Sequence, residues 1–388
     1  MDFAIMTKRE SELQLNMIVT PFVVGKGVPV WWEPLFLSCC NGSIFTSGVW
    51  IQTWLDIYGK NLDGIWVRWE HRGVVVGGCL LVTRVATKWL MPMRFIFLNA
   101  TGETARRAPT PEYNDILYVH GYEESICADA TQLVQSMRWS QFHVLGYCEN
   151  ALVARVISGL PLAVAESDKK AANFVNLATL TEIQFESSLI GSGGSRIRRN
   201  RRLYEKAEGN LKVVRARNLD EAMYFFNELA TLHNLRWRTK GVNGTFLDKA
   251  VVEFHQRLIG SLWPLGSVDL ISVRSVKNVI GYLYNFTMEK KVYFFQSGFA
   301  YEVGSKLSPG LLTHTLCIEH YRQNGFCEYD FLAGDAQYKR TLAKEMRFLY
   351  WTVAYRNTLW SRLQLLARRI KWRLQRRFHR SATPFTAD

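Results

Sequence analysis

The feature that most limits how this chain can fold is a succession of predicted elements that occurs twice. Helical spacing of apolar residues and β-rich apolar runs follow one another in a similar order in both halves, although no residue-level repeat is visible. The first half predicts helices at 48–58, 123–137 and 150–158, and strands at 65–69, 73–83, 94–99, 142–147 and 162–165. The second half predicts helices at 220–235, 248–262, 309–322 and 336–342, and strands at 211–215, 268–273, 279–288, 292–299, 328–332 and 348–355. The shared order indicates an α/β (α+β) fold of two similar units with mixed sheets.

Length and composition agree with two folded units. The 388 residues suffice for two domains at about 100–200 residues each. A chain that is 48% hydrophobic and 21% charged has the balance of a globular protein, so a disordered chain is excluded. We expect a first unit at 1–170, a connecting segment rich in Gly, Ser and Arg at 171–210, a second unit at 211–355, and a basic amphipathic helix with a tail at 356–388.

Several classes of protein are excluded by pattern. The longest stretch without a charged residue, 34–55, is interrupted by Ser, Thr, Asn, Gln and Gly, so it does not predict a membrane span. The first residues lack a basic segment before an apolar one, so we expect no signal peptide. The seven Cys form no C-x-x-C pair and no Cys/His cluster. We therefore expect a cytoplasmic protein with reduced thiols and no metal.

The net charge of +14 favours anionic partners. A glycine-rich stretch, 191–194, predicts a flexible break, and a predicted helix follows it. That helix carries six cationic residues: Arg196, Arg198, Arg199, Arg201, Arg202 and Lys206. Such a cluster is compatible with a tRNA- or nucleic-acid-binding module, although a basic helix face is more often simply solvated.

A candidate anion site precedes the helix at 309–322. Ser308 suits the N-cap position and Pro309 the first helical position, so the helix start is well specified. The free N–H groups and the positive end of the helix dipole favour an anion there, and Lys306 adds charge. The structural alternative is a capped helix that binds nothing.

A second candidate site follows the strand at 328–332. The strand leads into a glycine turn and a short helix. Ligands of open α/β sheets gather at the carboxyl ends of strands. This order places Asp330, Asp335, Tyr338 and Lys339 near a possible site, although each alone could be a solvated surface residue.

Three segments together carry a resemblance to a known family. They are residues 47–54 (SGVWIQTW), residues 235–238 (LRWR) with Gly241, Gly244 and Phe246, and residues 308–312 (SPGLL) followed by 329–332 (YDFL), Gly334, Tyr338 and Lys339. Over roughly residues 45–345 the chain resembles the CelD-type acetyltransferases linked to cellulose and exopolysaccharide biosynthesis, within the GNAT superfamily. It is also similar to the FemABX aminoacyl transferases.

The resemblance implies two tandem GNAT-like units and acyl transfer, with acetyl as the expected group, from acyl-coenzyme A to an amine or hydroxyl acceptor. It implies polysaccharide or cell-envelope biosynthesis, with a sugar or amino sugar as acceptor, and no metal. The donor would lie on Ser305, Lys306, Ser308 and Gly310 in the second unit. Ser-Pro-Gly replaces the usual Q/R-x-x-G-x-G/A loop, a departure shared with FemABX proteins, which use aminoacyl-tRNA. An aminoacyl-tRNA-dependent transferase and a non-catalytic scaffold of a polysaccharide-synthesis complex therefore stay open.

The same resemblance implies roles for individual residues. Tyr338 and Lys339 match the FemABX pair after the last glycine turn, and Lys339 would stabilise developing negative charge or contact donor phosphate. Asp115 is the best match to an acidic residue that orients or deprotonates the acceptor. Arg236 is a further catalytic candidate. The expected substrate-binding residues are Tyr113, Tyr284, Asp330 and Asp335.

The C-terminal segment predicts a basic amphipathic helix. Residues 356–380 contain nine Lys or Arg and no acidic residue. Apolar residues recur at helical spacing, at Leu359, Leu363, Leu366, Ile370, Leu374 and Phe378, with Trp360 and Trp372 beside them. This composition is typical of a helix lying on an anionic membrane surface, and it predicts peripheral attachment to the cytoplasmic face. The alternative is that the apolar stripe docks on the protein's own surface.

Overall fold

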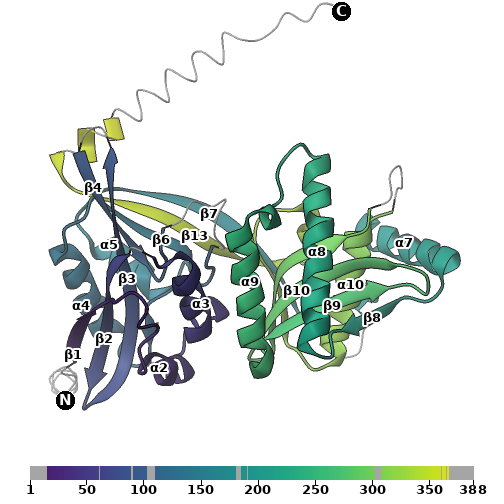
Figure 1. Cartoon of the computed structure of the whole chain (residues 1–388), viewed down its shortest axis with the longest axis horizontal. Coiled ribbons are helices and arrows are strands. Elements are labelled where there is room, and N and C mark those ends of the chain that lie inside the picture. Colours follow the sequence, from purple (N-terminus) through teal and green to yellow (C-terminus); the bar gives the residue numbers. More distant parts are fainter. Residues whose placement is uncertain are drawn as a thin grey trace, which may run out of the picture.

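The fold was analysed in a computed structural model (Figure 1), which describes residues 15–60, 62–88, 91–102, 110–180, 185–189, 191–301, 307–359, 361–363 and 365–366. The first half contains β1 (Asn16–Pro21), α2 (Trp32–Ser38), α3 (Gly48–Tyr58), β2 (Asp63–His71), β3 (Val74–Lys88), β4 (Met91–Leu98), β5 (Leu117–Tyr118), α4 (Glu123–Ser136), β6 (Gln141–Cys148), α5 (Leu152–Gly159) and β7 (Leu162–Asn176). The second half contains α6 (Phe185–Ser188), α7 (Ser192–Glu208), β8 (Lys212–Arg215), α8 (Leu219–Thr239), α9 (Lys249–Leu262), β9 (Val268–Arg274), β10 (Val279–Met288), β11 (Lys291–Phe299), α10 (Pro309–Gln323), β12 (Glu328–Ala333), α11 (Gln337–Leu342) and β13 (Glu345–Arg356).

All the described strands belong to one mixed sheet. Its order is β1-β2-β3-β4-β6-β13-β7-β12-β11-β10-β9-β8, with β5 paired to β3. Neighbours are antiparallel except for β4–β6 and β11–β12, which are parallel. The order strand, two helices, three strands, helix, strand, helix, strand occurs in both halves, apart from the small β5. The predicted mixed α/β fold is therefore confirmed, with the sheets of the two halves joined into one.

The two halves exchange their last strands. β13 ends the second half but lies between β6 and β7, and β7 ends the first half but pairs with β12. β7 and β13 pair with each other from Glu345/Phe174 to Arg356/Leu162 and form a long ribbon between the halves (Figure 1).

The sequence predicted a strand at 162–165 alone, which is too short by more than half. The missed part is 166–176, and its first residues, 166–170, are polar and exposed, so they show no apolar alternation. Lys169 lies over the ring of Phe348 at 3.9 Å and Lys170 over that of Trp351 at 4.4 Å. Cation–π contacts and ladder hydrogen bonds thus hold this part of the ribbon in place of a buried face.

An aromatic cluster forms the packing between the halves. Trp50 of α3 is fully buried, and its ring centroid lies 5.2 Å from that of Phe254 on α9 and 5.9 Å from that of Phe286 on β10. Phe45, just before α3, packs on Trp50 at 4.8 Å and on Tyr293 of β11 at 6.5 Å. Buried residues of both halves therefore belong to one hydrophobic core.

Two sequence predictions about local structure need correction. β1 and α2 were not predicted, since neither has a long periodic pattern. The glycine-rich stretch 191–194 is not a flexible break, because Gly193 and Gly194 lie in the first turn of α7. A Cβ atom on Gly193 would lie 2.6 Å from Thr341 of α11, and one on Gly194 would lie 2.0 Å from the carbonyl oxygen of Leu189. These glycines allow close packing at the start of α7.

We expect Trp50→Ala to lower the free energy of unfolding by about 3–5 kcal/mol, because it opens a cavity in the core shared by both halves. Trp237→Ala is the matched control, since Trp237 is 39% exposed. Chemical denaturation of both variants measures the difference. Equal stability of the two would contradict the role of Trp50 in joining the halves.

Candidate functional site

The candidate site lies where β11 and β12 separate. These parallel strands pair at three positions only: Lys291 with Glu328, Val292 with Tyr329, and Tyr293 with Asp330. Beyond Asp330 the register of β12 against β7 shifts, and Leu332 has a φ of +58°. A non-glycine residue is uncommon in this left-handed region, so Leu332 marks a local distortion of the strand. Beyond Tyr293 and Asp330 the two strands no longer pair, and we call this unpaired stretch the opening between β11 and β12.

A pocket of about 780 Å³ lies beside the N-terminus of α10, at the end of β11. Its lining comes from α7, α8, the end of β11, the start of α10 and α11: Arg196, Leu232, Leu235, Arg236, Thr239, Phe299, Tyr301, Leu307, Ser308, Gly310, Leu311, Gln337 and Tyr338. Two of these side chains are cationic, and no acidic side chain among the described residues lines the pocket. The guanidinium of Arg236 lies 4.2 Å from the ring centroid of Tyr301. The pocket is therefore suited to an anionic ligand.

The start of α10 differs from the prediction in one respect. Pro309 occupies the first turn as expected, but the Ser308 side chain makes no capping hydrogen bond. Gly310 is needed for packing, because a Cβ atom there would lie 2.9 Å from the ring of Phe299. The N–H groups of the first turn have no partner within the helix, so they remain available to a ligand. Ser305 and Lys306 lie outside the described residues.

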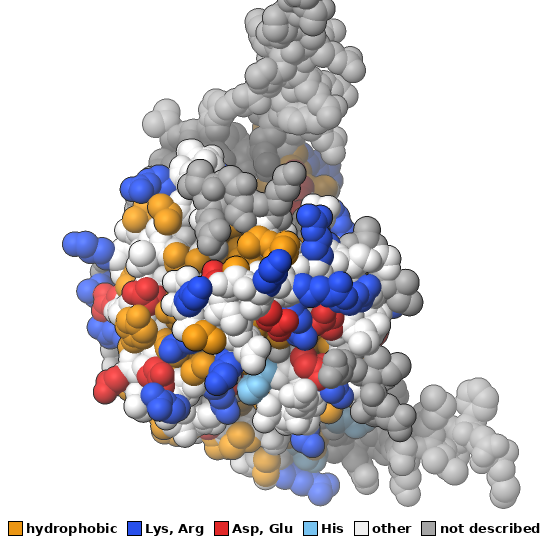
Figure 2. All heavy atoms as spheres, turned by 90° about the vertical axis from the view of Figure 1, so that its right-hand side faces the viewer, with side chains coloured by type: hydrophobic (Ala, Val, Ile, Leu, Met, Phe, Trp, Pro, Cys, Tyr) orange, Lys and Arg blue, Asp and Glu red, His pale blue; other side chains and the backbone are white. Residues whose placement is uncertain are grey.

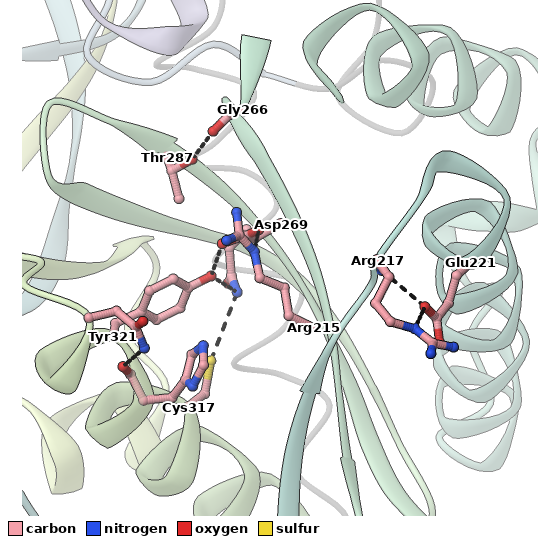
Figure 3. A network of polar contacts seen from close by, with 11 residues as sticks. Arg215, Arg217, Glu221, Gly266, Asp269, Thr287, Cys317 and Tyr321 are labelled. Carbon is pink, nitrogen blue, oxygen red and sulfur yellow. Dashed lines mark hydrogen bonds and ion pairs between the residues drawn. The ribbon is translucent and has the colours of Figure 1, made fainter. Parts of the chain in front are cut away.

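A buried polar network holds α10 against the sheet (Figure 3). The Tyr321 hydroxyl of α10 donates to Asp269 Oδ2 of β9 at 3.1 Å, and Asn285 Nδ2 of β10 donates to the Tyr321 oxygen at 3.1 Å. Arg215 of β8 forms an ion pair with Asp269. Burial raises the pKa of Asp269, and the charge of Arg215 opposes that rise. The network joins three strands to the helix whose N-terminus borders the pocket.

A loop of the first half reaches the point where β11 and β12 separate. The Tyr113 hydroxyl donates to Asp330 Oδ2, and the Tyr113 ring lies 5.8 Å from that of Tyr293. The neighbouring Glu112 accepts a hydrogen bond at Oε2 from the backbone N–H of Ala333 at 2.7 Å. Each of these two hydrogen bonds joins residues that are more than 200 positions apart in the sequence and belong to different halves of the chain.

Charged groups of the second half surround this contact. Lys339 Nζ donates to the carbonyl oxygens of Phe331, Leu332 and Ala333 at 2.7, 3.0 and 3.0 Å. Asp330 is fully buried, and its Oδ1 accepts from the Leu332 N–H at 2.7 Å. An ammonium has three donors, so the three carbonyls use the full capacity of Lys339 and fix the distorted end of β12.

Burial shifts the pKa values of these groups. Burial raises the pKa of Glu112 to about 7; the Ala333 N–H and the charge of Lys339 oppose that rise. Burial also raises the pKa of Asp330, and Arg347 is the strongest opposing group. Burial lowers the pKa of Lys339, while Glu112 and Asp330 oppose this. A carboxyl group that titrates near neutrality is suited to general base catalysis.

The structure brings some predicted site residues together and separates others. Tyr113, Asp330 and Lys339 form one cluster, and Arg236, Ser308, Gly310 and Tyr338 line the pocket beside it. Tyr284 is buried in the aromatic core, with its hydroxyl 3.5 Å from His255 Nδ1. Asp335 is exposed and forms an ion pair with Arg340. Glu112 was not among the predicted site residues; its place beside Tyr113 on the proline-containing loop was the available signal.

Asp115 lies apart from this cluster. Its carboxylate accepts hydrogen bonds from the N–H groups of Leu152 and Val153 at 2.9 Å each, at the start of α5. It also accepts from the Ile116 N–H at 2.8 Å and from Asn41 Nδ2 at 2.9 Å. These contacts hold the loop against α5. The predicted contact of Asp115 with the acceptor stays a prediction.

The corresponding opening of the first half is filled. β4 and β6 also pair at three positions, but Asn114 occupies the space beyond, donating through Nδ2 to the Leu98 carbonyl at 3.0 Å and through its N–H to the Gly146 carbonyl at 3.1 Å. α4, the counterpart of α10, has Glu123 and Glu124 in its first turn, whereas α10 has no acidic residue there. Acidic side chains at a helix N-terminus disfavour an anionic ligand.

The described part of the chain lacks two further features. No group of three or more His, Cys, Asp or Glu side chains there could hold a metal ion. No described helix is long and apolar enough to cross a membrane.

Comparisons with known proteins concern the second half's domain family and the fold. Residues 192–340 match the family model of the acetyltransferase (GNAT) domain, which confirms the resemblance predicted from the sequence. The crystal structure of FemX superposes with a TM-score of 0.54 at 9% identity, over 86% of this chain and 96% of that chain. A conserved protein of unknown function from Bacteroides thetaiotaomicron VPI-5482 superposes with a TM-score of 0.50 at 7% identity, over 88% and 100% of the two chains. At sequence identities this low, the similarity to these two structures shows a shared fold and nothing about function. A comparison with curated protein sequences gave no significant match.

We expect Asp269→Asn to lower the free energy of unfolding by about 1–3 kcal/mol, because it weakens the hydrogen bonds that the buried Asp269 carboxylate accepts from Arg215 and Tyr321. Asp335→Asn is the matched control, since that ion pair with Arg340 is exposed to water. Thermal or chemical denaturation compares the two. A larger loss for the control would show that the network does not hold α10.

Proposed function

We propose that this chain, whose residues 192–340 match the family model of the acetyltransferase (GNAT) domain, is an acyltransferase with its donor in the pocket beside α10 and its reaction centre where β11 and β12 separate. The expected reaction moves an acyl group, in the first instance acetyl, from acyl-coenzyme A to an amine or hydroxyl. A sugar or amino sugar of polysaccharide or cell-envelope biosynthesis is the acceptor class that the family resemblance favours.

The observation that carries the proposal is the charge of the pocket. Arg196, Arg236 and the first turn of α10 all face a volume of about 780 Å³ that no described acidic side chain lines. Ligand pockets measure about 300–1,000 Å³, and helix N-termini bind phosphate groups. The phosphates of coenzyme A would lie against these groups, with the pantetheine arm directed into the opening between the strands.

The reaction needs a base, an acid and a bound electrophile. Glu112 is the proposed base: one oxygen accepts from the Ala333 N–H, and its raised pKa lets it take a proton near neutral pH. The acceptor then forms a bond to the thioester carbonyl carbon, and the carbon–sulfur bond breaks. Tyr338 lines the pocket, and burial raises the pKa of its hydroxyl, so it stays protonated and can donate a hydrogen bond to the departing thiolate. The thiolate takes its proton from water, and Glu112 returns its proton to water. Lys339 acts through its positive charge, since the three carbonyls occupy its donors.

The first half has a different role in this proposal. It resembles the second half in its order of elements, but Asn114 fills its opening and two glutamates begin its α4. We therefore assign it no donor. Instead its loop supplies Glu112 and Tyr113 to the reaction centre of the second half.

One observation favours an aminoacyl-tRNA donor as a second candidate. Arg196, which lines the pocket, is followed along α7 by two further exposed arginines, Arg199 and Arg202. Figure 2 faces this end of the molecule, where Lys and Arg side chains outnumber acidic ones. Incubation of the protein with acetyl-coenzyme A or with aminoacyl-tRNA, each with amino-sugar acceptors, separates the two donors. Transfer from neither would favour a non-catalytic scaffold.

We expect Arg236→Ala to raise the KM for acyl-coenzyme A by roughly 10-fold or more, because a charged hydrogen bond contributes about 1.5–3 kcal/mol. Arg257→Ala is the control: Arg257 is half exposed and pairs with Glu253 on α9. Initial rates at varied donor concentration give both values. A KM that changes equally in the two variants would place the donor elsewhere.

We expect Glu112→Gln to lower kcat by roughly 100-fold, the lower bound for losing a general base. In the unchanged protein kcat/KM should rise with pH through about 7, where Glu112 loses its proton, and level off above. The variant should lack that rise. Glu124→Gln on the surface of α4 is the control. An unchanged pH profile in Glu112→Gln would exclude Glu112 as the base.

A further inference from the structure

The described residues beyond β13 form a short helical segment with two unlike faces. Residues 359, 361–363 and 365–366 are helical. Ser361 and Leu365 are buried, whereas Leu359, Leu363 and Leu366 are 77%, 49% and 54% exposed. The spacings of four and three place these three side chains on one face, which we call the leucine stripe.

The buried residues of the opposite face, Ser361 and Leu365, determine which way the leucine stripe points. Because Ser361 and Leu365 already pack inward, the segment cannot turn the stripe toward the protein without exposing them. The segment is also tied to the sheet, since the Arg356 N–H donates to the Ser140 carbonyl and the Asn357 N–H to the Pro161 carbonyl. At the described positions the stripe therefore does not dock on the protein's own surface, which was the alternative considered from the sequence.

Basic residues flank the stripe in the sequence. Arg362 lies between its leucines and is exposed, and residues 356–380 contain nine Lys or Arg and no acidic residue. The adjoining ends of the strands β3 and β4 also expose a basic and an apolar side chain. Arg94 of β4 is exposed, and its carbonyl accepts a hydrogen bond from the Ser140 N–H. Val85, which pairs with Arg94 on the strand β3, is 61% exposed. In Figure 1 the ends of β4 and β13 lie at the same edge of the molecule.

We propose that the leucine stripe and its flanking cations are a docking surface for an anionic lipid bilayer. Apolar side chains would enter the boundary between headgroups and acyl chains, and the cations would contact lipid phosphates. A second copy of this chain fits less well, because each copy carries a net charge of +14 and the same basic segment. The proposal does not depend on acyl transfer, so either can fail without the other.

The test is sedimentation of the full-length protein with phosphatidylcholine vesicles, with and without phosphatidylglycerol. We expect binding to the anionic vesicles, weakened by salt. The triple variant Leu359→Ser, Leu363→Ser, Leu366→Ser should bind them at least about tenfold more weakly. The matched control replaces three leucines of similar exposure elsewhere: Leu37, Leu247 and Leu265, at 76%, 61% and 61%. The control should bind normally.

Two further measurements make the outcome decisive. Circular dichroism and thermal unfolding must show that the stripe variant folds; if it does not, the single variants Leu359→Ser and Leu363→Ser replace it. Gel filtration detects a dimer. Loss of a dimer in the stripe variant without loss of vesicle binding would assign the stripe to a second copy and overturn the proposal. Equal binding of the stripe variant and the control, or no binding of the full-length protein, would also overturn it.

Discussion

The packing of Trp50 against Phe254 and Phe286 is the interaction on which the arrangement of the two halves depends. Each half alone would expose one side of this cluster, because α3 and α9 cover each other. Burial of large aromatic rings is among the strongest contributions to a core. The same packing determines where the proline-containing loop of the first half meets β12. The Tyr113 ring packs against this core, and its hydroxyl donates to Asp330.

Several local features could be predicted from the sequence because they follow from short-range chemistry. The strands β10 and β11, the glycine turn before β3 and the start of α10 at Pro309 are each specified by adjacent residues. The full length of β7 could not be predicted, because its middle is exposed on both faces. Alternation of apolar and polar residues marks a strand only where one face is buried. The exchange of β7 and β13 is a property of pairing between distant segments, and periodicity carries no information about it.

Some residues of the candidate site could likewise be predicted from the sequence, and others could not. Asp330, Tyr338 and Lys339 were selected by their places after a strand and a glycine turn, whereas Tyr113 was taken from the family resemblance. The structure brings Tyr113, Asp330 and Lys339 together. The choice between Asp115 and Glu112 needed the structure, because both are carboxylates on one loop. Four donors surround Asp115, whereas the backbone N–H of Ala333 is the donor that reaches Glu112 among the described residues. Such a difference depends on which way each side chain of an irregular loop turns, and no residue pattern encodes that.

The exchange of the last strands has a consequence for how the protein is made. During synthesis β6 emerges long before its neighbour β13, which follows residue 344, and β7 must wait for β12. The first half therefore leaves the ribosome with an unpaired edge on β6 and a long strand that has no partner. Unpaired edges favour association between chains. We expect nascent chains to need protection from aggregation until the last strand has been translated, and neither half to complete its own sheet alone.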